Sequence, residues 1–578
     1  MPKYSMPVGN TNFREIRETG LYYVDKSMLI DQIVEQTKAK VTLFTRPRRF
    51  GKTLNMSMLQ HFFDIREDSK ALFEGLAITE KKELCDNWMN QYPTILVSFK
   101  TVDAISYDYA EAQLKIVLAD LFRDHIYLLQ NTDMNKNDAE TIRRITARKA
   151  DMSDMMDSLS LLTRLLYHHY SKPVILLIDE YDVPMAKGDA NGYYREITNI
   201  MRSMYNKSLK DNPYIKLAVL TGCLRIAEES IFTGLNNLVV KDITDTQYDE
   251  YFGFTNAEME ILLNDTQLSE KMPVFRQWYD GYVFGNKEVY CPWDVLNYVD
   301  ALQRNPNALP VNYWANTSGN DAVKKFLDSG FTVTKDFETL LGGGYIEKKI
   351  NPNITYGDLT KSETNLWSVL YMTGYLTIIQ ETLPDMTSAD PDEIRGMYEL
   401  PFKLRLPNKE IKILFEETIA AWFEERIYRD SRIDLFKALW DGDAETLANI
   451  ISRYLRTTIS FYDYSEAFYH AFLTGLFSGI GDICVTSKRK PGSISIKSNR
   501  EYGEGRADVV VENRITQKAA VLEFKIAKSL TDVSSMCDVA LSQIHDIGYA
   551  ESLQEEEGYE LISYGVIFYK KRCFIKKA

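Results

Sequence analysis

The sequence predicts an α/β protein built from a parallel β-sheet with flanking helices, a helical middle part and a C-terminal α/β part. Three observations carry this prediction. Apolar, strand-like runs alternate with helical patterns through residues 1–240, which is typical of a parallel sheet covered by helices. Residues 241–455 show helical periodicity with aromatic corners. Beyond them the period returns to two residues, as in paired strands.

The length supports several domains. A chain of 578 residues is too long for a single hydrophobic core. We therefore predict domains at 1–240, 241–455 and 456–578. A hydrophobic content of 45% and a charged content of 26% are those of an ordinary globular protein.

Charge and cysteine usage narrow the function classes. A net charge of -14 argues against a surface that is basic throughout, so any contact with DNA is expected to be local. The six cysteines form no C-x-x-C pair, which signals neither zinc nor a disulfide framework. We find no signal peptide and no membrane-spanning run, so we expect a cytoplasmic protein without a membrane partner.

The first motif lies at residues 41–53. A strand-like run leads into a basic turn, and Gly51, Lys52 and Thr53 then open a helical pattern. This order predicts a loop whose N–H groups bind the phosphates of ATP, with Lys52 on the β- and γ-phosphates and Thr53 on Mg²⁺. Arg49 of the basic turn is included among the nucleotide-binding residues. Arg46 stands where the general motif has its first glycine. The alternative is a basic helix start that binds no nucleotide.

A second motif ends the apolar run of residues 172–182. Asp179 and Glu180 follow the buried strand directly, as in a Walker B motif. Asp179 would hold Mg²⁺ through its water shell, and Glu180 would polarise the attacking water. The alternative is a buried strand with an acidic cap.

Further residues are weaker candidates for the same site. Thr221 ends another apolar strand, as a sensor of the γ-phosphate would, and Arg225 follows it as a candidate arginine sensor. An ordinary strand end with a surface arginine is an equal alternative. An adenine ring could lie among the apolar residues upstream of the loop, although simple packing is favoured for them: Phe13, Ile16, Tyr22 and Tyr23.

The C-terminal part contains a third constellation. An amphipathic helix at 464–476 carries Glu466, and two strands at 505–512 and 519–525 form a hairpin with Asp508 on the first and Glu523 and Lys525 on the second. Asp508 and Glu523, with Glu466, would hold a divalent ion, and Lys525 would activate the water. This is the PD-(D/E)XK arrangement of nucleases. Basic residues before the hairpin could contact phosphates or simply solubilise a loop: Lys488–Lys490, Lys497, Arg500 and Arg506.

Together these residues carry a family resemblance. The chain resembles the bacterial AAA-ATPase-like family in its segments 22–26, 45–53, 177–182, 220–226, 231–237 and 252–255. The resemblance implies a divergent P-loop ATPase in front of a PD-(D/E)XK-nuclease-like domain, with ATP and Mg²⁺ as cofactors. In that family the basic turn at 45–53 is usual. Gln543 matches the family's trailing helix residue.

We therefore predict an ATP-binding AAA-like ATPase coupled to a Mg²⁺-dependent nuclease domain that acts on DNA or other nucleic acid. Hydrolysis is less firmly indicated than binding, because the first glycine is missing. Oligomerisation stays open. The alternative is a nucleotide-dependent switch or scaffold whose C-terminal domain binds DNA or protein without cutting. The complete set of Asp508, Glu523 and Lys525 favours the enzyme, since a binding module has no need of it.

Overall fold

The computed structural model describes residues 4–36, 39–131, 134–225, 237–314, 334–351, 354, 362–379, 401–426, 429–458, 466–477, 494–502, 505–514, 516–546 and 558–578. The chain divides into two compact units. The first comprises Met1–Thr317 with Glu347–Glu410, and the second comprises Ser318–Ile346 with Ile411–Ala578. The finer division at 240/241 and 455/456 stays a prediction.

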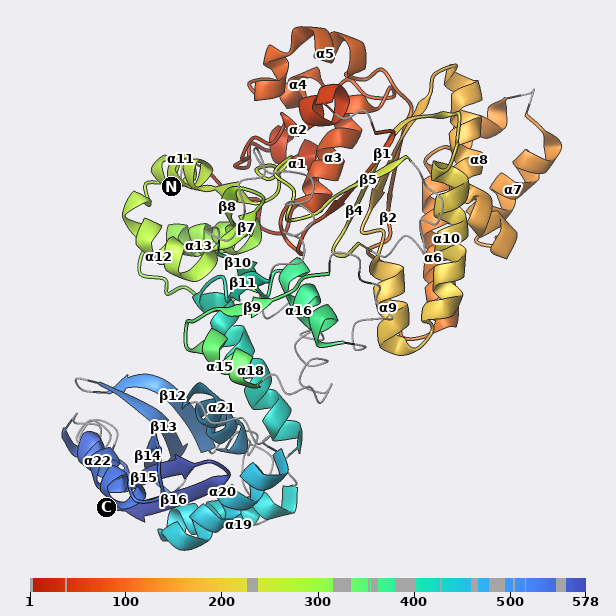
Figure 1. The fold of residues 1–578 in the computed structure, drawn as a ribbon. Helices are drawn as coiled ribbons and strands as arrows, with labels where there is room; N and C mark the ends of the chain where they lie inside the picture. The colour runs from red at the N-terminus through yellow and green to blue at the C-terminus, as the bar shows by residue number, and fades with distance from the viewer. Residues whose placement is uncertain are drawn as a thin grey trace. The chain divides into compact units, whose positions relative to one another are not determined.

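A five-stranded parallel sheet forms the centre of the first unit (Figure 1), which confirms the predicted fold class. Its strands follow the spatial order β2-β3-β4-β1-β5, so β4 lies between the strands that carry the two predicted nucleotide motifs. Apolar side chains on both faces keep β1 and β3 fully buried. The strands are β1 (Val41–Thr45), β2 (Thr94–Ser98), β3 (Val174–Asp179), β4 (Ile215–Gly222) and β5 (Leu238–Lys241).

Helices cover both faces of this sheet. Helix α3 (Lys52–Phe63) lies on one side, while α6 (Tyr107–Arg123), α8 (Met152–Tyr170) and α10 (Tyr194–Leu209) lie on the other (Figure 1). Their apolar residues recur every three or four positions and close the core against the strands. The remaining helices of this region are α1 (Phe13–Glu18), α2 (Leu29–Asp31), α4 (Lys70–Phe73), α5 (Lys82–Trp88), α7 (Lys136–Thr146) and α9 (Val183–Asn191).

The rest of the first unit is helical and aromatic, as predicted, but it also contains short strands. Helices α11 (Asn256–Asp265), α12 (Met272–Tyr279) and α13 (Pro292–Arg304) share a core with the small antiparallel sheet β6-β8-β7. These strands are β6 (Phe254–Thr255), β7 (Tyr282–Phe284) and β8 (Lys287–Tyr290). Further elements are α16 (Glu363–Met372), β9 (Ile346–Lys348), β10 (Thr377–Ile378) and β11 (Phe402–Arg405).

The second unit contains a mixed sheet in the order β12-β13-β14-β15-β16. The predicted hairpin is confirmed, because β13 pairs antiparallel with β14 and Val509 lies opposite Leu522. Strands β14 and β15 pair in parallel, and such a pair needs a crossover, which α22 supplies. The strands are β12 (Ile494–Tyr502), β13 (Gly505–Asn513), β14 (Lys518–Ile526), β15 (Glu560–Tyr569) and β16 (Arg572–Lys577).

The described residues of this unit also form helices α15 (Thr334–Leu341), α18 (Lys409–Arg426), α19 (Arg429–Asp441), α20 (Ala444–Thr458), α21 (Glu466–Phe477) and α22 (Val533–Asp546). Helix α18 begins in the first unit and continues into the second. Within the described stretches, no helix combines the length and apolarity that crossing a bilayer requires.

Candidate nucleotide and nuclease-like sites

The basic turn between β1 and α3 has the backbone of a tight loop. Gly51 precedes α3 with a φ of 83°, and Arg49 adopts a φ of 71°. Both values lie in the left-handed region, which glycine adopts without strain and other residues rarely do. The turn thereby makes Lys52 the first residue of the helix and Thr53 the second.

Arg46, at the position of the missing glycine, has a structural role. Its side chain is fully buried, and Nη1 donates to the carbonyl oxygens of Thr45 and Lys241 at 2.9 Å each. The guanidinium also lies over the rings of Phe252 and Phe284. Burial lowers the pKa of Arg46 to about 10, which leaves the group charged at neutral pH. The arginine therefore ties the start of the loop to β5 and to residues beyond the sheet.

Lys52 is buried at the centre of the site. Its Nζ donates to the carbonyl oxygens of Arg46 and Pro47 at 3.1 Å each, and it lies 3.4 Å from Oε1 of Glu180. Burial alone would lower the pKa of Lys52, but Cys223 and three nearby carboxylates raise it above its ordinary value. Since burial raises the pKa of Cys223 to about 11, the thiol is neutral and the carboxylates hold the positive charge.

The Asp179 carboxylate gathers hydroxyl groups from three elements. Thr53 on α3 and Ser98 at the end of β2 each donate to Oδ2 at 3.0 Å, and Thr221 on β4 donates to Oδ1 at 2.7 Å. The carboxyl ends of parallel strands meet at one sheet edge, which explains why these residues converge. Ser98 was not predicted, although its place at the end of an apolar strand was a usable signal. A hydroxyl beside a carboxylate is an oxygen donor set that suits Mg²⁺.

Glu180 lies next to this cluster in a strained backbone conformation. Its φ is 51°, in the left-handed region that non-glycine residues seldom occupy. Burial raises the pKa of Glu180, and Lys52 partly offsets that effect. Asp182 fixes the neighbouring strand end, because its Oδ2 accepts from the N–H groups of Cys223 and Leu224 at 2.9 and 3.0 Å.

Two predicted nucleotide-binding residues have other surroundings. The Arg49 guanidinium donates to the Tyr313 carbonyl oxygen at 2.9 Å and lies over the Trp293 ring. These partners belong to the helical part of the first unit rather than to the Lys52 and Asp179 cluster. Arg225 is half-buried at the end of the described stretch after β4.

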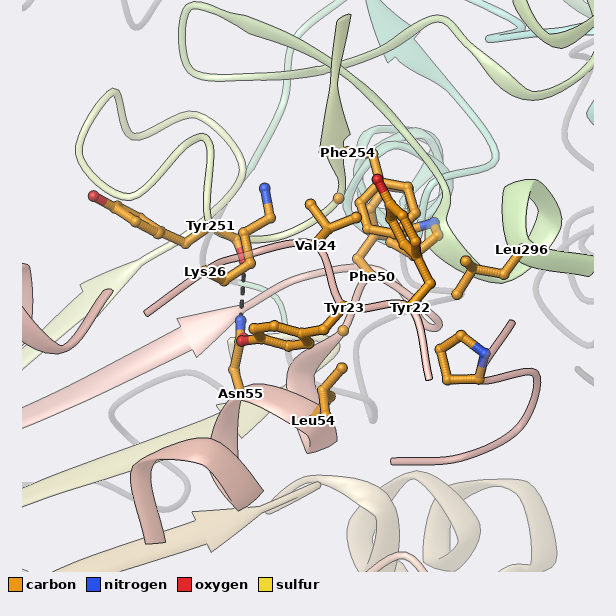
Figure 2. Close-up of a pocket in the computed structure, with 14 residues that line it drawn as sticks. Tyr22, Tyr23, Val24, Lys26, Phe50, Leu54, Asn55, Tyr251, Phe254 and Leu296 are labelled. Carbon is orange, nitrogen blue, oxygen red and sulfur yellow. Dashed lines mark hydrogen bonds between the residues drawn. The ribbon is translucent and has the colours of Figure 1, made fainter. Parts of the chain in front are cut away.

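Gly51 is also one of the residues that line an aromatic pocket, shown in Figure 2. Of the four residues predicted to surround a base, Tyr22 and Tyr23 line this pocket, whereas Phe13 and Ile16 are fully buried in the core. Five further lining residues were not predicted for this pocket. Phe50 and Leu54 flank the Gly51–Thr53 turn, whereas Tyr251, Phe254 and Leu296 come from distant segments.

Few polar atoms of this pocket are available to a ligand. Lys26 donates to both carboxylate oxygens of Glu258. The Asn55 amide donates to the Tyr251 carbonyl oxygen (Figure 2). The lining residues surround a small cavity of about 60 Å³ that opens to solvent. Its aromatic walls suit contact with the face of a flat ring, and the cavity would have to widen to take in a whole base.

In the second unit the structure brings together the predicted residues of the hairpin. Lys525 Nζ lies 3.2 Å from Oε1 of Glu523, and Oδ2 of Asp508 accepts from the Phe524 N–H at 3.0 Å. Oε2 of Glu523 is buried and has no hydrogen-bond partner among the described residues. Burial, followed by the charge of Asp508, raises the pKa of Glu523 to about 7. Two repelling carboxylates with an unsatisfied oxygen fit a divalent cation.

His470 on α21 was not predicted. Its Nε2 lies 3.0 Å from the carbonyl oxygen of Asp508, which ties the helix to the strand that carries the acid. Glu466 begins the same helix one turn earlier, so its backbone is on the face of His470. The Glu466 side chain lies outside the described part, and Gln543 is half-buried on α22.

Other predicted features also fall outside this description. Residues 488–490 are not described, and neither are the side chains of Lys497, Arg500 and Arg506. Among the described residues no group of three or more His, Cys, Asp or Glu side chains is placed to hold a metal. A cation at the C-terminal site would therefore rely on Asp508, Glu523 and solvent or substrate oxygens, with Glu466 as a further candidate.

The comparisons identify the class of each part. Residues 7–232 match the family described as "Predicted AAA-ATPase", and residues 464–578 match the PD-(D/E)XK nuclease superfamily. The chain thus combines an AAA-ATPase-like domain with a PD-(D/E)XK nuclease domain, as the resemblance implied. It is also 24% identical, over 565 residues, to "Uncharacterized protein in vnfD 5'region" of Azotobacter chroococcum mcd 1. That similarity covers 95% of this chain and 94% of the relative.

Proposed function

We propose that the first unit binds ATP with Mg²⁺ and hydrolyses it slowly, and that the C-terminal domain is a metal-dependent nuclease under its control. The observation that carries the ATPase half is the cluster at the sheet edge. Lys52 and Thr53 open α3, whereas Asp179 ends β3. Thr53 donates to Asp179, and Lys52 pairs with Glu180, the next residue after Asp179. A buried, charged lysine beside a hydroxyl and carboxylate pair is suited to a phosphate chain and its cation.

In this proposal each residue has a separate task. Lys52 would leave its loop carbonyls for the β- and γ-phosphates, Thr53 would donate its oxygen to Mg²⁺, and Asp179 would hold the water shell of the ion. Glu180 would orient the attacking water. Thr221, on β4, would contact the γ-phosphate as its sensor, and Arg225 is a further candidate contact.

The aromatic pocket beside Gly51 is proposed to receive the adenine ring. Leu54 follows Thr53 directly on α3 and lines this pocket, so a nucleotide whose phosphates lie at Lys52 would have its base nearby. Apolar and aromatic walls favour stacking over hydrogen bonding.

For the C-terminal domain we propose cleavage of a phosphodiester bond in nucleic acid. Asp508 and Glu523 would bind a divalent ion, and Lys525 would hold or activate the water. The observation that supports this half is the buried Oε2 of Glu523 beside a second acid. DNA is the expected substrate, contacted by the basic residues of the segment 488–506.

A cytoplasmic location is part of the same proposal. The five described cysteines, Cys85, Cys223, Cys291, Cys537 and Cys573, are free thiols, and free thiols are typical of a reducing compartment.

The alternative function is a nucleotide-dependent switch or scaffold whose C-terminal domain binds without cutting. It would use the same ATP site, so only the C-terminal chemistry separates the two proposals.

Calorimetric titration of the full chain with ATP·Mg²⁺ tests the ATPase half. Lys52→Ala should weaken binding at least about tenfold, because charge-assisted contacts to two phosphates are lost. Glu83→Ala, at an exposed residue of α5, serves as the matched control. An ATP affinity unchanged in Lys52→Ala would contradict the assignment.

A further inference from the structure

Glu410 joins two of the places where the chain passes between the units. The segments of the first unit end at Thr317 and at Glu410. Oε1 of Glu410 accepts hydrogen bonds from the N–H groups of Tyr313 at 2.6 Å and Trp314 at 2.9 Å. One carboxyl oxygen therefore joins two stretches of chain. The first is 313–314, the last described residues before the chain first leaves the first unit, and the second is the first turn of α18, where the chain leaves that unit again.

The carboxyl group that does this is deeply buried. Glu410 and Asp294 are both fully buried, and each contributes to the shifted pKa of the other. Burial, followed by the neighbouring Asp294, raises the pKa of Glu410 to about 10. The pair therefore keeps a proton near neutral pH, so the two carboxyl groups can lie side by side in the interior without two buried negative charges.

The phosphate loop contacts this junction directly. Arg49 donates to the carbonyl oxygen of Tyr313 at 2.9 Å, so Tyr313 is held by the loop through its C=O and by Glu410 through its N–H. Pro47 and Trp314 also both lie close to Gly374, since a Cβ added to Gly374 would meet Pro47 at 3.0 Å and Trp314 at 3.3 Å.

Nucleotide binding has a direct route to these contacts. Lys52 Nζ donates to the carbonyl oxygens of Arg46 and Pro47, which belong to the same turn as Arg49. Phosphate oxygens bind an ammonium group more strongly than neutral carbonyls do. Phosphates that take Lys52 would release both carbonyls, and the turn would then be free to change its conformation.

We propose that Arg49, Tyr313 and Glu410 form a relay that transmits the nucleotide state of the phosphate loop to the segments leading into the second unit. Glu410 is its positioning residue. The relay rests on the proposed binding of ATP and adds the route by which that binding would control the C-terminal domain. A ligand at one site affects another only through a difference in contacts between two states. In the proposed relay, that difference would lie in the contacts of Arg49 and Pro47.

Hydrogen exchange of the full chain, with and without saturating ATP·Mg²⁺, tests the relay. In the native protein ATP should change the protection of amides at 311–314 and 411–418 about fivefold or more. Glu410→Ala should abolish that change while its ATP affinity, measured by calorimetry, stays native. Glu410→Gln should restore the change, because its amide oxygen still accepts from Tyr313 and Trp314. Glu83→Ala is the exposed control.

Two results would overturn the relay. One is native ATP binding with no change of exchange at 311–314 and 411–418. The other is a native-like change in Glu410→Ala. If Glu410→Ala does not fold, Arg49→Ala at saturating ATP replaces it and should lose the change. Absence of ATP binding in the calorimeter is a separate result that refutes the proposed function, and the relay with it.

Discussion

The ammonium group of Lys52 lies 3.4 Å from the carboxylate of Glu180, so the lysine that opens α3 and the acid that follows β3 form a buried ion pair. In the proposed function both partners act on ATP, the first on its phosphates and the second on the attacking water. Each is thus held by the other until a nucleotide takes the lysine. Release of Glu180 would then accompany ATP binding.

Glu180→Gln should separate binding from hydrolysis. The amide keeps the size of the side chain but cannot polarise water as a carboxylate does, so phosphate release should fall about 100-fold or more. ATP should still bind, because Lys52, Thr53 and Asp179 are unchanged. A coupled phosphate assay beside calorimetry measures both quantities. Turnover that survives intact would mean that another group orients the water.

Arg46→Gly, which restores the glycine of the general phosphate-loop motif, should destabilise the protein rather than improve it. The variant loses buried, charged hydrogen bonds to Thr45 and Lys241 and leaves a cavity, at a cost of at least about 2 kcal/mol. Chemical denaturation measures this loss. Arg48→Ala, at an exposed neighbour, is the control, and equal stability of the two variants would show that Arg46 has no structural role.

Leu54→Ala should weaken the binding of ATP but not of inorganic tripolyphosphate. The leucine lines the aromatic pocket, and the loss of its apolar contact with a base would cost about 1.4 kcal/mol, or about tenfold in affinity. Competition binding with both ligands measures the difference. Equal losses for the two ligands would place the base elsewhere.

The stability of the metal-free chain should depend on pH through Glu523. Its pKa is raised from an ordinary 4.5 to about 7, so the folded state binds the proton more tightly than the unfolded state. The stabilisation is therefore complete below pH 4.5 and is lost as the pH rises through about 7. Mn²⁺ should restore stability at high pH, because it replaces the proton.

Melting curves between pH 5 and pH 8, with and without Mn²⁺, check this prediction. About half of the effect should remain midway between the two pKa values, and little of it above the raised pKa of about 7. Glu523→Gln is the matched control, since an amide does not titrate. A native protein whose pH profile and response to Mn²⁺ equal those of Glu523→Gln would contradict the metal site.

Local sequence order predicted the parts of the sites that lie close to a strand end. Lys52, Thr53 and Asp179 follow apolar strands, and parallel strands must deliver such residues to one edge. The hairpin with Asp508, Glu523 and Lys525 follows in the same way from the period of two. For these residues, knowledge of the local element was enough to place the side chain.

The roles of residues whose partners lie far away in sequence could not be predicted from local sequence patterns. Arg46 read as a departure from a motif because its partners at β5 and Phe252 are about 200 residues away in sequence. His470 meets the backbone of Asp508 across two elements. Arg49 was expected at the phosphates, and only tertiary structure shows that its guanidinium contacts Tyr313 and Trp293.

The most direct test of the whole account is a cleavage assay of the purified chain with Mg²⁺ or Mn²⁺ on single- and double-stranded DNA and RNA, with and without ATP. The account predicts metal-dependent cutting that changes with ATP, and its loss in Asp508→Ala and in Lys525→Ala, with lower metal affinity in the first variant only. The ATP effect, but not the basal cutting, should disappear in Lys52→Ala. No cleavage of any substrate under any of these conditions would contradict the nuclease and leave the switch or scaffold as the better description.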